Sequence, residues 1–179
     1  MTGPYADADP NAQVDPQAYR EMIGRFATGV GIVTAEYAGQ RFAMTANSIT
    51  SVSTNPLLVL ASFMRESETG AAVSRSGRFG LSILEAQAGR DIAKRCAGKL
   101  DPRRAEDQLT GIATYRGPDG IPLIEGALEC MVCAVEQLHA IGDHDVVIGR
   151  ASRVPEAEAK GEPLVFYDGR FWSLEESSG

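Results

Sequence analysis

The feature of this chain that most constrains its fold is a series of short β-rich runs separated by tight turns. Residues 30–37 are followed by Ala38-Gly39 and by a second run from Gln40 onward, which predicts a hairpin. Strands that recur with short turns, beside only two or three helices, predict a mainly β protein built as an antiparallel barrel with helices at its ends. The further expected strands are residues 57–64, 79–84, 126–139, 145–154, 164–167 and 170–174, of which the last two form a hairpin around Asp168-Gly169.

The first helix is expected to begin at Asp15-Pro16 and to stop at Gly29. Aspartate is a preferred N-cap residue, and proline suits the first helical position because the N–H that it lacks has no helical partner there. Glycine is a common helix stop. An apolar stripe at helical spacing predicts either a core face or a dimer contact. The stripe consists of Tyr19, Met22, Ile23 and Phe26.

Two further helical segments are expected at residues 73–77 and 85–97, and Gly98 ends the second. Residues 99–120 contain charges, proline and glycine with weak periodicity, which predicts a loop that could cover a site as a lid. Residues 1–14 predict a disordered tail. The remaining residues, 15–175, are expected to form a single domain.

Composition and charge narrow the class of protein. Hydrophobic residues make up 44% and charged residues 23% of the 179 residues, which is typical of a soluble globular domain. The formal net charge of −7 repels a phosphate backbone, so nucleic acid is not an expected partner. No apolar run approaches the roughly 20 residues of a membrane span, and the N-terminus lacks the pattern of a secretory signal. We therefore expect a cytoplasmic protein with no membrane partner.

The cysteines and histidines exclude several kinds of site. Three cysteines are an odd number and predict no disulfide framework. Cys130 and Cys133 match the C-x-x-C pattern, but residues three apart in a strand point to opposite faces, so we expect core thiols. Two histidines are too few for a histidine-rich metal site. The chain also lacks a glycine-rich dinucleotide fingerprint, a P-loop and the Gly-x-Ser-x-Gly motif of hydrolases.

Residues 41–62 combine a small, polar segment with an apolar strand. Between Met44 and Thr54 most side chains are small or hydroxylated, so the backbone could approach a flat polar ligand closely. The alternative is a strand end followed by a Ser/Thr-rich turn. Residues 57–61 are wholly apolar and follow Asn55-Pro56, which predicts a strand buried on both faces.

A junction between a strand and a helix is expected at residues 65–69. Arg65, Ser67 and Thr69 lie there, where unpaired N–H groups and the positive end of a helix dipole could hold a phosphate. The alternative is a capping Ser67 with acidic residues around the first helical turn.

His144 and Trp172 are further candidates for contact with a ligand. His144 follows Gly142-Asp143 at a turn between two expected strands, where an imidazole can be aimed into a barrel mouth with its tautomer set by a neighbour. A surface turn histidine is the alternative. His139, by contrast, is expected to be partly buried with its hydrogen bonds satisfied. Trp172, the only tryptophan, is expected to pack within the last hairpin, with stacking on a ligand as the alternative.

A set of short motifs is specific through its order and spacing rather than through any one member. The motifs are Gly24-Arg-Phe-Ala-Thr-Gly-Val30, Met44-Thr-Ala-Asn-Ser48, Ser51-Val-Ser53, Asn55-Pro56 with Leu57 to Leu60, Gly126-Ala-Leu128, Gly142-Asp-His144 and Ile148-Gly149. Together they resemble the short-chain flavin reductase family over residues 19–174. Members of this family are the reductase components of two-component flavin-dependent monooxygenases and have an FMN-binding split-barrel fold.

The resemblance implies an NAD(P)H:flavin oxidoreductase that reduces FAD or FMN by hydride transfer, forms a homodimer and supplies free reduced flavin to a partner monooxygenase. It implies that residues 45–48 lie along the isoalloxazine ring, 62–69 hold the ribityl and phosphate groups, and 82–87 border the flavin. Residues 142–144 are associated with the nicotinamide, and His144 is expected to position it as the catalytic residue. The implied binding residues are Thr45, Ala46, Asn47, Ser48, Ser62, Phe63, Ser67, Thr69, Ser82, Leu84, Gln87, Gly142, Asp143 and His144.

Two alternatives stay open on the same barrel. One is a non-enzymatic flavoprotein that carries electrons or binds flavin, and the other is an oxidase of the pyridoxamine-phosphate type. His144 favours the reductase over a carrier, because a carrier has no nicotinamide to position. The scarcity of basic residues for a second phosphate disfavours the oxidase. The arginine-bearing segment 99–120 could cover an adenylate, which favours FAD, and no pair of arginines is placed for a 2′-phosphate, which favours NADH.

Overall fold

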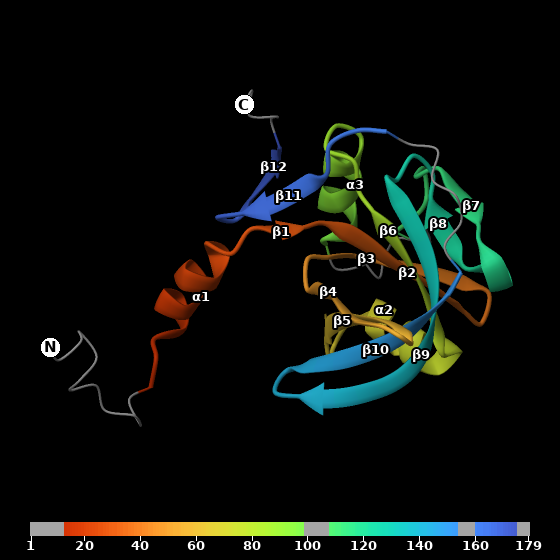
Figure 1. Cartoon of the computed structure of the whole chain (residues 1–179), viewed down its shortest axis with the longest axis horizontal. Helices are drawn as coiled ribbons and strands as arrows, with labels where there is room; N and C mark the ends of the chain where they lie inside the picture. Colours follow the sequence, from red (N-terminus) through yellow and green to blue (C-terminus); the bar gives the residue numbers. More distant parts are fainter. Residues whose placement is uncertain (1–12, 99–107, 154–159, 175–179) are drawn as a thin grey trace, which may run out of the picture.

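The computed structural model of the chain describes residues 13–98, 108–153 and 160–174 (Figure 1). Most of the expected N-terminal tail and residues 99–107 of the expected lid lie outside this described part. Its largest element is a curved sheet of seven strands, and every pair in it is antiparallel, as predicted. In spatial order the strands are β3 (Gln40–Ala46), β2 (Gly31–Tyr37), β6 (Arg78–Ile83), β9 (Glu129–Ile141), β10 (His144–Arg153), β5 (Leu57–Met64) and β4 (Ile49–Thr54).

The seven-stranded sheet separates two clusters of buried side chains. Strand β9 supplies both clusters with its alternating side chains: Cys130 and Val132 belong to one, and Cys133 belongs to the other. Cys130 and Cys133 are both buried free thiols, which confirms the sequence-based prediction. Burial raises the pKa of the Cys133 thiol to about 12, so this thiol stays protonated at neutral pH.

Two helices pack on the sheet, and a third stands apart from it. α2 (Glu68–Ser76) contacts β2, β3 and β6, and α3 (Gly89–Cys96) contacts β3 and β2. α1 (Pro16–Gly24) begins as predicted, because Asp15 Oδ2 accepts a hydrogen bond from Ala18 N at 3.1 Å. α1 has no buried residue and projects away from the sheet in Figure 1. None of the helices in the described part is long and apolar enough to pass through a lipid bilayer.

The C-terminal hairpin forms a small sheet of its own. β11 (Leu164–Tyr167) and β12 (Arg170–Ser173) pair as predicted, and β11 also pairs with β1 (Thr28–Gly29). This pairing joins the end of the described chain to the segment that follows α1. Phe166 and Phe171 meet edge to face within the hairpin, with ring centroids 5.5 Å apart, and both pack against the first core cluster.

A second small sheet covers the seven-stranded sheet on the side of the first core cluster. Its two strands enclose a short 3-10 helix, η1, and they are antiparallel. Thr34 on β2 holds this sheet in place, because its buried hydroxyl donates a hydrogen bond to Pro122 O. The elements are β7 (Thr114–Arg116), η1 (Pro118–Gly120) and β8 (Pro122–Ile124).

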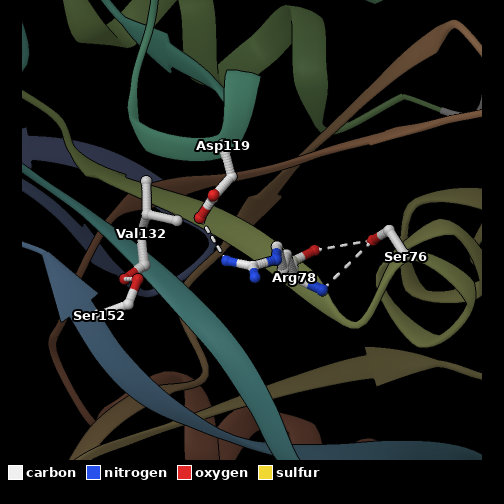
Figure 2. A network of polar contacts seen from close by, with 5 residues as sticks. All are labelled: Ser76, Arg78, Asp119, Val132 and Ser152. Carbon is white, nitrogen blue, oxygen red and sulfur yellow. Dashed lines mark hydrogen bonds and ion pairs between the residues drawn. The ribbon is translucent and has the colours of Figure 1, made fainter.

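Side chains at the start of β6 connect the sheet with its neighbours, as Figure 2 shows. Arg78 forms an ion pair with Asp119 of η1. Ser76, the last residue of α2, donates its hydroxyl to Arg78 O at 3.0 Å, so α2 is joined to the strand that follows it. Ser152 on β10 donates to Val132 O on β9 at 2.9 Å. The first two contacts fasten the sheet to η1 and α2 at the beginning of β6, and the third joins two neighbouring strands within the sheet.

The helices differ from the prediction at their ends. α1 ends before the expected stop at Gly29, because Gly29 is paired in β1. α2 extends N-terminally beyond the expected residues 73–77 to Glu68, and the prediction of a capping Ser67 at the strand-to-helix junction is confirmed. α3 begins later than the expected residues 85–97, because Glu85 accepts two backbone hydrogen bonds in the turn that precedes it.

The strands differ from the prediction in two ways. The prediction that residues 57–61 are buried on both faces is wrong, because β5 alternates between buried and more exposed side chains and leaves Leu57 54% exposed. The Ser/Thr-rich residues 49–54 form the edge strand β4 rather than a turn. Strands β7 and β8 were not predicted, and β7 lies within the segment expected to be loop.

Candidate functional site

A pocket of about 250 Å³ opens where β3, the N-terminus of α2 and the C-terminus of α3 meet. The sheet brings these segments together although they are far apart in the sequence. Three of the residues expected to bind flavin line the pocket: Thr45, Ser67 and Thr69. The other lining residues are Met44, Met64, Glu66, Glu68, Cys96, Ala97, Gly98 and Gln108.

The N-terminus of α2 forms one wall of the pocket. Ser67 is the N-cap of α2, because its Oγ accepts a hydrogen bond from Gly70 N at 3.1 Å. The Ser67 hydroxyl also lies 3.4 Å from the sulfur of Met44, which lines the pocket from β3. Thr69 is 3% exposed, so its side chain is packed into the helix start. The remaining N–H groups of this first turn and the helix dipole favour an anion or a polar ligand edge.

The wall made by β3 and α3 is held by two polar side chains. Thr45 donates its hydroxyl to Ala93 O at 2.6 Å, so its oxygen keeps only acceptor capacity for a ligand. Gln108 accepts a hydrogen bond from Ala43 N at 3.3 Å and donates one to Gly98 O at 2.9 Å. Gln108 was not among the predicted site residues, because its role depends on contacts with two segments distant in sequence.

The charges around the pocket are mainly negative. Glu66 and Glu68 both line it, and the guanidinium of Arg65 lies beside Asp145, with Nε 3.8 Å from Oδ1. Cys96 is buried at the pocket wall, and burial raises the pKa of its thiol to about 11. A thiol of this kind is protonated at neutral pH and is a poor nucleophile. The pocket is therefore suited to binding rather than to covalent catalysis.

The segment between β3 and β4 lies at the surface beside this wall. Asn47 and Ser48 are exposed, and Ala46 is buried beneath them. Ser48 donates its hydroxyl to Ser62 O at 3.2 Å, and Ser62 N donates to Ser48 O at 3.3 Å, so the segment is held against β5. Phe63 is 1% exposed and packs in the second core cluster.

The predicted residues of 82–87 lie outside the pocket lining. Ser82 is fully buried, and its hydroxyl oxygen accepts a hydrogen bond from Ile124 N at 3.1 Å. Leu84 packs in the first core cluster. Gln87 is exposed in the turn before α3, where its N–H donates to the carboxylate of Glu85. The structure therefore brings these residues into the core and onto the surface rather than to the pocket.

The Gly-Asp-His turn joins β9 to β10 one strand away from the pocket. Gly142 has a φ of +59°, a conformation that favours glycine. His144 lies opposite Met64 in the β10–β5 register, and Met64 lines the pocket. The backbone oxygen of Asp143 accepts a hydrogen bond from Arg65 N at 3.1 Å, which ties this turn to the segment that precedes α2.

The side chains of Asp143 and His144 form a hydrogen-bonded pair. His144 Nδ1 lies 2.7 Å from Asp143 Oδ1. This hydrogen bond lowers the pKa of the Asp143 carboxyl below its usual value. The imidazole remains 41% exposed, so it is oriented by its neighbour and still accessible to a ligand.

Comparisons with known proteins show the family of the chain. The chain matches the flavin reductase like domain over residues 23–175. It is 36% identical to an NADH-dependent flavin reductase of a Rhodococcus species, over 98% of this chain and 94% of that protein. It is 33% identical to the reductase subunit HsaB of a flavin-dependent monooxygenase from Rhodococcus jostii, over 90% of this chain and 80% of the relative.

Solved structures show the same fold. The NADH:FAD oxidoreductase SgcE6 of Streptomyces globisporus, in complex with NAD and FAD fragments, aligns with a TM-score of 0.82 at 31% identity, over 94% of this chain and 99% of that one. BorF, the flavin reductase component of a bacterial two-component tryptophan halogenase, aligns with a TM-score of 0.81 at 33% identity, over 91% of this chain and 100% of that one. The split-barrel fold expected from the sequence is thereby confirmed. On both the sequence match and the structural likeness, the chain belongs to the flavin reductase like domain family.

Proposed function

We propose that this protein is an NADH-dependent flavin reductase that transfers a hydride to FAD or FMN and releases the reduced flavin to a partner flavin-dependent monooxygenase. The pocket between β3, α2 and α3 carries the proposal, because it lies one strand away from the Gly142–His144 turn. The relatives support it, since they include an NADH-dependent flavin reductase and a monooxygenase reductase subunit.

The flavin ring is proposed to lie along residues 45–48. Thr45 lines the pocket, and the exposed side chains of Asn47 and Ser48 can hydrogen-bond the polar edge of a flat ring. Hydrogen-bond donors at this edge stabilise the negative charge that develops on the ring during reduction. Ala46 and Phe63 would support this segment from the core, and Ser62 holds it through its backbone.

The ribityl and phosphate groups are proposed to lie at the N-terminus of α2, beside Ser67 and Thr69. Backbone N–H groups and the helix dipole favour a phosphate there. Glu66 and Glu68 line the same pocket, and their negative charge weakens the binding of an anion. This balance fits a flavin that is bound and released as a substrate. The predicted residues Ser82 and Leu84 are buried outside the pocket lining, so of this segment only the exposed Gln87 is proposed to border the flavin.

His144 is proposed to position the nicotinamide of NADH. Hydride transfer requires the nicotinamide carbon to lie against the flavin N5 with little water between them, and the protein contributes mainly orientation. The pairing of β10 with β5 places His144 next to the pocket edge, and Asp143 orients the imidazole. Gly142 permits the turn that presents this pair.

The proposed quaternary state is a homodimer. The apolar stripe of α1 is exposed and has no partner among the described residues, with Tyr19 55%, Met22 60% and Phe26 70% exposed. A pocket of about 250 Å³ is also smaller than the roughly 300–1,000 Å³ of typical small-molecule sites. A second subunit would cover the stripe and could add a wall to the site.

The proposed location is the cytoplasm. The three cysteines are free, buried thiols, which suits a reducing compartment. Reduced flavin can diffuse from this protein to the monooxygenase there, so the two enzymes need no permanent complex.

The experiment that tests the proposed function follows NADH oxidation in air through the loss of its near-ultraviolet absorbance. Rapid oxidation that requires added FAD or FMN is the expected result, and the higher kcat/KM identifies the preferred flavin. Reactions without flavin serve as controls. If neither NADH nor NADPH is oxidised in the presence of either flavin, the proposed reductase activity is rejected. The alternative of a non-enzymatic flavin-binding protein then takes its place.

A further inference from the structure

A second pocket, of about 580 Å³, lies between α3 and the edge strand β12. Arg90 and Lys94 line it from α3, and residues 169–173 line it from the hairpin. Its size falls within the roughly 300–1,000 Å³ of small-molecule sites. None of the residues expected to bind flavin or nicotinamide belongs to this pocket.

The second pocket is positively charged in a chain whose net charge is −7. It gathers the side chains of Arg90, Lys94 and Arg170. Within residues 13–98, 108–153 and 160–174, neither the Arg90 nor the Arg170 side chain forms an ion pair or a hydrogen bond, and Lys94 has only a distant acid, Asp91 Oδ1, 4.0 Å from its Nζ. Two guanidinium groups with unused donors and an ammonium are suited to phosphate oxygens.

Trp172 adds an aromatic surface to this cationic pocket. Its indole Nε1 donates a hydrogen bond to Tyr167 O at 3.1 Å, which restrains the ring within the hairpin. The residue is nevertheless 47% exposed and lines the pocket. An exposed aromatic ring beside cationic side chains is the combination that binds a nucleobase and its phosphates.

The outer face of α3 connects the two pockets. Arg90, Lys94 and Ala97 are spaced as i, i+4 and i+7, so they lie along one face of the helix. Arg90 and Lys94 line the second pocket, whereas Ala97 lines the first. At 1.5 Å per residue, Arg90 and Ala97 are about 10 Å apart along the helix axis. One elongated ligand can therefore reach from the first pocket into the second.

We infer that the pocket between α3 and β12 binds the adenosine diphosphate moiety of a dinucleotide whose reacting ring lies in the first pocket. Arg90, Lys94 and Arg170 hold the phosphates, and Trp172 stacks on the adenine. FAD and NADH both carry this moiety, so either substrate could supply it. The inference rests on the proposed function, because that function requires a dinucleotide along this side of the molecule.

Binding of ADP itself tests the inference without any turnover. Trp172 is the only tryptophan, so its fluorescence reports on this pocket alone. We expect ADP to change the fluorescence saturably, and an Arg90→Gln/Arg170→Gln variant to weaken ADP binding by about tenfold or more. Arg150→Gln is the matched control, because Arg150 is a surface arginine on β10 that pairs with Glu136 at 2.7 Å. This control should bind ADP as the parent protein does.

Two kinetic ratios then identify the dinucleotide. FMN and reduced nicotinamide mononucleotide lack the ADP moiety of FAD and NADH. If FAD supplies it, the double variant raises the ratio of the KM for FAD to that for FMN. If NADH supplies it, the variant raises the ratio of the KM for NADH to that for the reduced mononucleotide.

The inference is overturned if ADP leaves the fluorescence of Trp172 unchanged at millimolar concentration, or if the double variant binds ADP as tightly as the parent. It is also overturned if ADP binds here but neither kinetic ratio changes. Failure of the proposed function would look different, because NADH oxidation would then be absent in the parent protein while the ADP titration could still be measured.

Discussion

At the scale of single residues, the ring nitrogens of His144 have different surroundings. Nδ1 is engaged with Asp143 Oδ1 at 2.7 Å, and this contact lowers the pKa of the Asp143 carboxyl. An ionised carboxylate only accepts hydrogen bonds, so Nδ1 carries the proton of the pair. Nε2 is then the nitrogen that can meet the carboxamide of a nicotinamide. This arrangement fits the proposed role of His144, which is to orient a ligand rather than to transfer a proton.

The substitution His144→Ala should therefore affect the pyridine nucleotide selectively. We expect a higher KM for NADH and a lower kcat, because the nicotinamide loses an orienting contact. Flavin affinity should stay within about threefold, which corresponds to roughly 0.65 kcal/mol. Steady-state kinetics with each substrate varied in turn measure the nucleotide parameters, and flavin fluorescence measures the affinity for flavin.

His139→Ala is the matched control for this substitution. His139 is exposed on β9, so the expected partial burial is wrong, and its Nε2 lies 3.0 Å from Gln137 Oε1 rather than at the proposed site. Its replacement should leave the parameters for both substrates unchanged. A loss of flavin binding in His144→Ala, with the nucleotide parameters unaltered, would contradict the proposed role of His144.

At the scale of elements, local patterns predicted the hairpins well. Ala38-Gly39, Gly142 and Asp168-Gly169 all adopt positive φ at turns between paired strands, which the turn chemistry of these residues favours. The N-terminus of α1 was predicted for the same kind of reason, because Asp15 is a local cap. Signals of this kind act between near neighbours, so a single sequence contains them.

Edge strands and short paired strands were less predictable. β4 consists largely of Ser and Thr, and it is extended because β5 supplies its hydrogen-bond partners. β7 and β8 have three residues each and are stabilised by their pairing with each other and by Thr34 beneath them. Pairing with neighbouring segments therefore determines that these residues form strands, and their intrinsic strand preference does not.

The residues of the candidate site were likewise predictable where the signal is local and unpredictable where it depends on tertiary contacts. Ser67 and Thr69 stood out because hydroxyl residues cluster at a helix start, and the structure places both in the pocket. Gln108 gave no signal, because it contributes only through its contacts with β3 and Gly98. Ser82 and Leu84 came from the resemblance alone, and their burial becomes visible only once β6 is packed between its neighbours.

The turn before α3 gives a prediction that depends on pH. Glu85 accepts hydrogen bonds from Gln87 N and Ala88 N at 2.9 Å, and these bonds lower the pKa of its carboxyl from the ordinary 4.5. A carboxylate with a lowered pKa stabilises the fold above its ordinary pKa, and this contribution is lost as the pH falls through the lowered value. Glu85→Gln should therefore lower the Tm near neutral pH, and the difference from the parent should shrink as the pH falls below 4.5.

Thermal unfolding followed by circular dichroism at several pH values measures this effect. Glu125→Gln is the control, because the exposed Glu125 carboxylate has no hydrogen bond or ion pair with any described residue. The control should match the parent across the range. A Tm difference for Glu85→Gln that is independent of pH would mean that the carboxylate does not stabilise this turn through its charge.

At the scale of the whole molecule, the two buried clusters stabilise the sheet, whereas α1 does not take part in either. The helix is N-capped and amphipathic, yet its apolar side chains are exposed and the helix projects away from the sheet (Figure 1). Short helices gain little stability in isolation, so most of their stability comes from packing against another surface. For α1 the surface that fits the proposed homodimer belongs to a second copy of the chain.

A variant of this stripe should separate the subunits. We expect the parent protein to sediment near twice its chain mass of 19.1 kDa, and Met22→Glu/Phe26→Glu to sediment near 19.1 kDa, because two buried carboxylates would oppose the association. Gln13→Glu/Gln40→Glu adds the same charge at exposed positions outside the stripe and should remain dimeric. Far-ultraviolet circular dichroism checks that the sheet is intact in both variants. A parent protein that sediments as a monomer, or a stripe variant that stays dimeric, would show that α1 does not join two copies of the chain.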